Sequence, residues 1–184
     1  MSRLKIKIFI FFILFSGCKN LHAQNVSLEG AREMFFAMDK SGEGALKLYK
    51  SLENADLSQN PVMMAYRGAA SAAAAGSADG VRKKLEFFNR GKGELEKAAA
   101  IKPLDAEIRF LRLATQINAP GFLGYSSDIN NDKSIIINTL SSVSANHANA
   151  YLYHRICSFM LEHADLKSTE KSTVNQLLVK FKPK

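Results

Sequence analysis

The chain has 184 residues, 47% of them hydrophobic, and a formal net charge of +8 at pH 7. Four basic residues and no acidic residue lie in residues 1–24, so the rest of the chain carries 21 basic against 17 acidic side chains, a net charge of +4. This modest charge, with no basic stripe interleaved with aromatic residues, argues against nucleic-acid binding.

The N-terminal segment is predicted to be an export signal. Three basic residues precede an unbroken apolar run at residues 8–15, and small and polar residues follow it. This order is typical of a bacterial export signal, and the run is much shorter than the roughly 20 residues that span a bilayer. We therefore divide the chain into a signal, residues 1–24, and a single domain, residues 25–184.

Two processing routes are open for this signal. The run "FSGC" resembles a lipobox, which would leave a lipid on Cys18, whereas "LHA" before Gln24 resembles an ordinary signal-peptidase site. We expect a protein of the periplasm or outer envelope, either soluble or lipid-anchored. Cys157 is the second of two cysteines, so either route leaves it without an intrachain partner, and stability must come from packing.

The rest of the chain is predicted to be all-α, with eight helices arranged as four hairpins. Apolar residues at helical spacing, capping residues and breaks place the helices at about 27–39, 45–54, 61–77, 79–101, 107–117, 128–142, 146–163 and 169–181. No stretch shows the sustained two-residue alternation of a strand, and "SIIIN" sits inside a longer helical pattern.

The third and fourth helices carry small residues that favour close approach. After Tyr66 the third helix consists almost entirely of Ala, Gly and Ser. The fourth contains Gly91 and Gly93, each costing about 1 kcal/mol relative to Ala inside a helix. These glycines predict either a kink or a tight helix crossing.

The segment "GELEKAAAIKPLDAEI" resembles the second helix of a tetratricopeptide repeat running into the next repeat. The matching positions are the late proline, the two small residues, the large apolar residue and, in "MMAYRGAASA", the glycine of the first helix: Pro103, Ala98, Gly91, Leu95 and Gly68. The resemblance covers about residues 62–117. It implies a right-handed stack of antiparallel helical hairpins, in which neighbours bury faces that one hairpin cannot cover alone.

The connection "INAPGFLGYSSDINNDKSIII" is unusually apolar for a loop. We expect Phe122, Leu123 and Tyr125 to plug the seam between the third and fourth hairpins, with Asp128 capping the next helix. The alternative is an exposed docking patch for a partner. The longer segment "EIRFLRLATQINAPGFLGY" also resembles one that recurs in small uncharacterised exported bacterial proteins, a resemblance that implies no activity.

One face of the fifth helix carries a polar stripe. Arg109, Arg112 and Gln116 project to one side at about 100° per residue, opposite the apolar residues of the helix. The stripe resembles the concave-groove residues with which tetratricopeptide proteins clamp a carboxylate or an extended peptide. The alternative is a solvated face with Arg109 paired to Glu107 or Asp105.

Two other patterns fail as ligand sites. "DINNDKS" puts acidic and amide residues at three calcium-loop positions, Asp128, Asn130 and Asp132, but Lys133 and Thr139 stand where Gly and Glu are required. "NRGKGE" lacks the early Gly and the Ser or Thr of a phosphate-binding loop. We therefore expect a helix cap with solvated amides in the first case and discard a phosphate-binding loop in the second.

The seventh helix carries three histidines and a cysteine: His147, His154, Cys157 and His163. At about 100° per residue, Cys157 falls on the apolar face and His154 on the solvated one. His147 and His154 are about 10.5 Å apart along the helix, too far to share an ion without other ligands. We expect a packed thiol, a surface imidazole and no metal site.

No motif for a nucleophile, a catalytic cysteine or a paired set of carboxylates is evident, so no catalytic residue, metal or cofactor is assigned. The sequence favours a non-catalytic module of the bacterial envelope that binds a protein or peptide through Arg109, Arg112 and Gln116. The second hypothesis is a structural accessory subunit, lipid-anchored at Cys18, that docks through the turn at residues 120–126. The third is an enzyme of unrecognised class.

Overall fold

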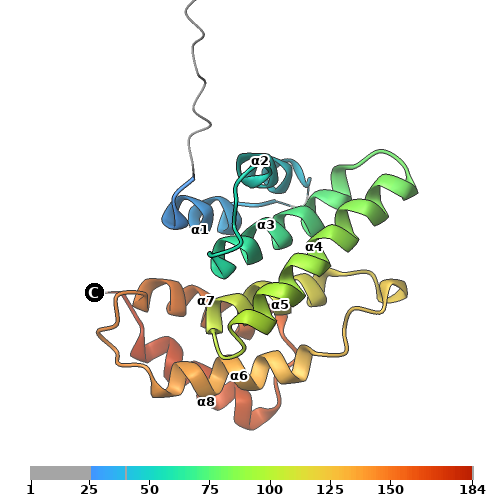
Figure 1. The fold of residues 1–184 in the computed structure, drawn as a ribbon. Coiled ribbons are helices and arrows are strands. Elements are labelled where there is room, and N and C mark those ends of the chain that lie inside the picture. The colour runs from blue at the N-terminus through green and yellow to red at the C-terminus, as the bar shows by residue number, and fades with distance from the viewer. Residues whose placement is uncertain (1–25, 40, 184) are drawn as a thin grey trace, which may run out of the picture.

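The computed structural model describes residues 26–39 and 41–183, so the predicted signal and Cys18 lie outside the described residues. The helices are α1 (Leu28–Phe36), α2 (Glu43–Leu52), α3 (Pro61–Ala74), α4 (Val81–Ile101), α5 (Ala106–Asn118), α6 (Ile129–Ser142), α7 (Ala150–His163) and α8 (Ser168–Lys180), with 3-10 turns η1 (Ala75–Ser77) and η2 (Gly121–Leu123). The part of the chain that is described contains no strand, which confirms the all-α prediction (Figure 1). None of its helices combines the length and apolar character of a membrane span.

Capping residues fix several helix starts where the sequence indicated them. The Ser27 hydroxyl accepts a hydrogen bond from the Gly30 N–H at 3.0 Å. The Asn60 side chain accepts one from the Met63 N–H at 3.2 Å, and Pro61 occupies the first helical position. Each cap satisfies a backbone donor that has no partner within its helix, which explains why these local signals predict helix starts well.

Two helices occupy the centre of the molecule. Helix α3 contacts α2, α4, α5 and α1, and all but three of its 14 residues are buried. Helix α5 contacts α3, α4, α6 and α7. In Figure 1, α5 lies between α1, α2 and α3 on one side and α6 and α8 on the other. Residues on α5 are therefore covered from several directions, so the polar side chains of this helix can be buried.

Helices α3 and α4 cross at glycine. A Cβ atom added to Gly91 would lie 2.4 Å from the Gly68 carbonyl oxygen and 2.6 Å from the Ala72 nitrogen. A Cβ atom on Gly93 would meet no atom within 4 Å. Of the two predicted alternatives, Gly91 therefore marks a tight crossing, and α4 runs unbroken through both glycines.

Helix α1 also contacts α7, which is more than 110 residues away in the chain. The Arg155 guanidinium lies 3.8 Å from the centre of the Phe36 ring and donates a hydrogen bond to Glu33 at 3.0 Å. Arg32 donates to the Asn149 side chain at 3.4 Å. These contacts join α1 to α7 and to the residue that precedes it.

Candidate functional site

The polar stripe of α5 lies inside the molecule. The Arg109, Arg112 and Gln116 side chains are buried, and all three donate hydrogen bonds to the carboxylate of Asp132 on α6, which is fully buried. The donor–acceptor distances are 3.0 Å from Arg109 Nη1, 2.8 and 2.7 Å from Arg112 Nε and Nη2, and 2.7 Å from Gln116 Nε2. Both carboxylate oxygens are thus saturated by charged or amide donors.

This arrangement corrects the groove prediction. The three residues share one face and clamp a carboxylate, as the stripe suggested, but the carboxylate belongs to the same chain. Arg109 also donates to the Pro103 carbonyl at 2.8 Å rather than pairing with Glu107 or Asp105. Because α6 covers this face of α5, the stripe is neither a partner groove nor a solvated surface.

The internal network continues toward the aromatic turn. Arg112 Nη1 donates to Glu96 at 2.7 Å, and the Tyr125 hydroxyl donates to the other Glu96 oxygen at 2.8 Å. Burial alone would lower the pKa of Arg112, but its hydrogen bonds and charge interactions with Asp132 and Glu96 raise that pKa above the ordinary value. Burial, and then the bond to Glu96, raise the pKa of the Tyr125 phenol. Arg112 therefore stays charged and Tyr125 stays neutral at neutral pH.

The structure confirms the predicted burial of only part of the aromatic turn, residues 120–126. The Tyr125 side chain is buried against Ala72 and Phe88, with the two rings edge to face at 5.8 Å. Leu123 is partly buried in the same cluster, whereas Phe122 is 85% exposed. Tyr125 therefore plugs as expected, but against α3 and α4 of the second hairpin rather than between the third and fourth, and the expected burial of Phe122 is wrong.

Asp128 occupies the position before α6 without a side-chain cap. Its carbonyl oxygen accepts the Asp132 N–H at 2.9 Å, but its carboxylate makes no capping hydrogen bond. The Asp128 N–H instead donates to the Gln116 side chain at 3.2 Å. The predicted helix start is confirmed, and the predicted capping role of the carboxylate is wrong.

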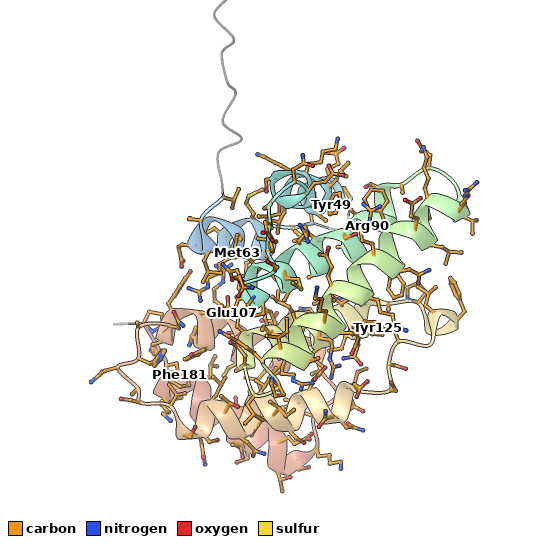
Figure 2. All side chains as sticks on the ribbon, in the orientation of Figure 1. Tyr49, Met63, Arg90, Glu107, Tyr125 and Phe181 are labelled. Atoms are coloured by element: carbon orange, nitrogen blue, oxygen red, sulfur yellow. The ribbon has the colours of Figure 1, made fainter. Side chains whose placement is uncertain are left out.

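A second buried carboxylate, which the sequence analysis did not single out, joins three helices near the centre of the molecule (Figure 2). Glu107 on α5 accepts hydrogen bonds from Arg32 of α1 at 2.8 and 2.7 Å and from the Tyr66 hydroxyl of α3 at 2.7 Å. Burial, together with the nearby charge of Glu107, raises the pKa of Tyr66. The site is a structural junction because every polar group in it has a partner inside the protein.

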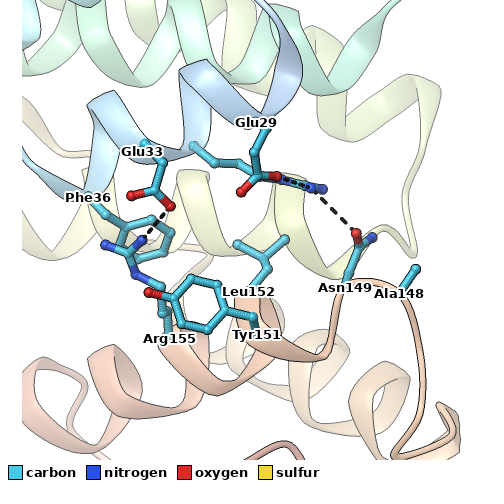
Figure 3. A pocket seen from close by; sticks show the side chains of 9 residues that line it. Glu29, Glu33, Phe36, Ala148, Asn149, Tyr151, Leu152 and Arg155 are labelled. Atoms are coloured by element: carbon cyan, nitrogen blue, oxygen red, sulfur yellow. Dashed lines mark hydrogen bonds and ion pairs between the residues drawn. The ribbon is translucent and has the colours of Figure 1, made fainter. Parts of the chain in front are cut away.

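A small cleft lies where α1 faces α7 (Figure 3). Its volume is about 60 Å³, roughly that of two water molecules. The lining residues are Glu29, Arg32, Glu33, Phe36, Ala148, Asn149, Tyr151, Leu152 and Arg155. Its arginines already bind Glu29, Glu33 and Asn149, so the cleft offers little room and few unsatisfied donors to a small-molecule substrate.

The three histidines and the cysteine predicted for the seventh helix do not all lie on it, because α7 begins at Ala150 and His147 lies in the turn before it. Cys157 is buried as expected, and burial raises the pKa of its thiol to about 12. His154 is not solvated as predicted: its Nδ1 lies 3.1 Å from the Leu178 carbonyl oxygen of α8. His147 and His163 are exposed. Among residues 26–39 and 41–183, no three side chains of His, Cys, Asp or Glu are grouped to hold a metal ion.

Comparison with protein-family models, with curated proteins and with solved structures finds no match. Among the described residues, several apolar side chains are exposed, including Phe122 on the aromatic turn, Val81 on α4 and Val179 on α8. The small cleft between α1 and α7 also lies at the surface. The two buried carboxylate clusters, by contrast, are internal.

Proposed function

We propose that this chain is a non-catalytic interaction module that binds a protein or peptide through its aromatic turn, residues 120–126. The observation that carries the proposal is the exposure of Phe122, at 85%, in a turn that is anchored by the buried Tyr125 and the partly buried Leu123. A large aromatic side chain in water is unfavourable for an isolated molecule, and aromatic residues are common anchors at protein interfaces.

The turn holds Phe122 in a defined position. Its backbone is closed by hydrogen bonds from the Leu123 N–H to Pro120 at 2.9 Å and from the Gly124 N–H to Gly121 at 3.1 Å. Gly124 has a φ of +60°, a conformation that suits glycine. Tyr125 anchors the end of the turn through its buried ring and its bond to Glu96. A backbone that is already closed into a turn loses little conformational entropy on binding, which favours affinity.

The chemistry of the turn indicates the kind of partner. The Phe122 ring fits an apolar pocket on the partner, and the Lys92 ammonium lies 5.1 Å from the ring centre of Tyr125 in the same turn.

The proposal includes the predicted location and architecture. The N-terminal residues favour export to the bacterial envelope, either as a soluble protein or as an accessory subunit tethered through Cys18. A tetratricopeptide-like arrangement of hairpins is supported by contacts within each predicted pair, α1 with α2, α3 with α4, α5 with α6 and α7 with α8. Intact-mass measurement of the exported protein distinguishes acylation of Cys18 from removal of residues 1–24.

Site-specific photo-crosslinking tests the docking surface. A photoreactive amino acid placed at Phe122 should give a discrete crosslinked species in the envelope fraction. The same amino acid at Val179, which is 72% exposed on α8, is the matched control and should not give that species. Phe122→Ala should abolish partner binding while changing the free energy of unfolding by less than about 0.5 kcal/mol, because the ring is in water. Identical crosslinking from both positions would contradict the proposal.

A further inference from the structure

The N-terminal end of α4 forms an exposed tip that the proposed function does not use. Every residue from 79 to 86 is exposed, and the turn between α3 and α4 projects from the body of the molecule at the upper right of Figure 1. Val81 is 75% exposed and Leu85 38%. Between them lie three consecutive cations, Arg82, Lys83 and Lys84; residues 79–86 also contain two acids, Asp79 and Glu86, so their net charge is +1. Glu86 forms an ion pair with Arg90 at 3.2 Å, which leaves Asp79 as the acid beside the three cations.

The tip has an unfavourable charge arrangement for an isolated protein. A helix N-terminus carries the positive end of the helix dipole and favours acidic residues. The first turns of α1, α2, α5, α6 and α8 each contain an acidic residue, whereas those of α3, α4 and α7 contain none. Among the last three, the first turn of α4 is the one that carries cations. Within the described part of the chain, the side chains of Arg82, Lys83 and Lys84 form no ion pair or hydrogen bond. Their charges are therefore available to an external anionic surface.

The apolar and basic residues of the tip are ordered around the helix. Val81 and Leu85 are four residues apart and share one face. At about 100° per residue, Arg82 and Lys84 lie about 80° to either side of that face, and Lys83 lies opposite it. Two apolar side chains flanked by two cations form the contact pattern of a helix end that rests on lipid headgroups, with the long basic side chains reaching phosphates and the apolar ones entering the acyl boundary.

We propose that this tip, residues 79–86, docks on the surface of an anionic phospholipid bilayer. Charge complementarity supports the choice, because anionic lipids attract clustered Lys and Arg. The shape of the tip also favours a bilayer over an acidic protein, since its residues are exposed on every side of the helix. The proposal is independent of the aromatic turn and requires no lipid on Cys18.

Vesicle sedimentation measures the interaction directly. The protein carries Cys18→Ser, so that no acyl chain contributes, and the vesicles are phosphatidylcholine with about one third phosphatidylglycerol. One Lys or Arg near an anionic bilayer is worth roughly fivefold in partitioning. The double variant R82Q/K84Q should therefore lower the partition coefficient about 25-fold. V81S/L85S, which keeps all the charges, should also weaken binding.

A charge-matched control separates this tip from the general charge of the protein. The double variant K50Q/K171Q removes two charges from exposed positions on α2 and α8 and should lower partitioning less than about threefold, because screening confines the attraction to about 10 Å. Amide hydrogen exchange supplies a local readout: vesicles should slow exchange in residues 81–88.

Three results would overturn the proposal. The first is an equal loss of vesicle binding in R82Q/K84Q and K50Q/K171Q, and the second is unchanged exchange in residues 81–88 when vesicles are added. The third is retention of the protein on immobilised polyglutamate without any partitioning onto vesicles, which would assign the tip to an acidic protein partner instead.

Discussion

Asp132 shows how strongly a single side chain can tie two helices together. Its buried carboxylate accepts four hydrogen bonds from Arg109, Arg112 and Gln116 of α5. Removal of water from three charged groups is costly, and their mutual attraction and hydrogen bonds offset that cost only while all partners are present. The contribution of Asp132 is therefore best measured by taking away the acid and leaving the two guanidiniums buried.

Asp132→Ala should lower the free energy of unfolding by about 3–5 kcal/mol, because it leaves two buried cations with one fewer counter-charge. Urea denaturation followed by circular dichroism measures the change. Asp128→Ala is the matched control: its carboxylate is half exposed and lies 3.8 Å from Arg112, so the loss should stay below about 1 kcal/mol. Equal losses in the two variants would show that the buried network is not a major source of stability.

At the scale of the element, the crossing of α3 and α4 sets a steric limit on the sequence. Gly68 and Gly91 bring the two backbones together so closely that either Cβ atom would press against a carbonyl oxygen of the other helix. Gly91 matches the early small position in the tetratricopeptide resemblance. The small residues of α3 thus allow α4 to pack closely against it. The glycines lower the helix propensity locally, but they permit this close contact between the two backbones.

Gly91→Ala should destabilise the protein by about 1–3 kcal/mol through overpacking, because the added methyl meets backbone atoms that cannot move away easily. Gly93→Ala, two residues along the same helix, should instead stabilise it by up to about 1 kcal/mol, because its Cβ atom meets nothing. Thermal or urea unfolding of the two variants gives the comparison. Stabilisation by both substitutions would mean that the crossing relaxes freely.

The helices could be predicted from sequence because their signals are local. Asn60 and Pro61 mark the start of α3, and "SIIIN" lies within α6 as expected. Which helix covers which face could not be predicted in the same way. The stripe on α5 looks the same whether water or Asp132 faces it, and Asp132 lies 16 to 23 residues further along the chain.

One signal for the buried network was nevertheless present in the sequence. Asp132 falls in the apolar stripe of α6, three residues after Ile129 and four before Ile136. An acid in such a stripe requires buried donors. The contrast between Phe122 and Tyr125 had no comparable signal, because the hydroxyl of Tyr125 finds Glu96 29 residues earlier in the chain. Only the assembled fold decides which of the two rings is covered.

At the scale of the whole molecule, several buried acids hold their protons more tightly in the folded state. Burial raises the pKa of Cys157 to about 12 and also raises the pKa values of Tyr66 and Tyr125. As pH rises past the unfolded pKa of a thiol, about 8.5–9, the unfolded chain releases protons that the folded chain keeps. The stability contributed by these groups is complete below that pH and is lost progressively above it.

The free energy of unfolding should therefore fall between pH 9 and pH 11, with each such group contributing up to about 1.4 kcal/mol per pH unit. Urea titrations at a series of pH values measure the slope. Cys157→Ala removes one group and should make the slope shallower just above pH 9, where a free thiol ionises before a phenol. A stability that stays constant up to pH 11 would contradict the raised pKa values.

The contacts between α1 and α7 limit how proteins with this fold can gain or lose helices during evolution. A linear array of helical repeats can gain or lose a unit at either end, because each unit touches only its neighbours. Here Glu33 and Phe36 meet Arg155, and Arg32 meets Asn149, across more than 110 residues of chain. A duplicated hairpin placed before α7 would have to separate these pairs, so we expect variation in length to accumulate in the connecting loops rather than in the number of hairpins.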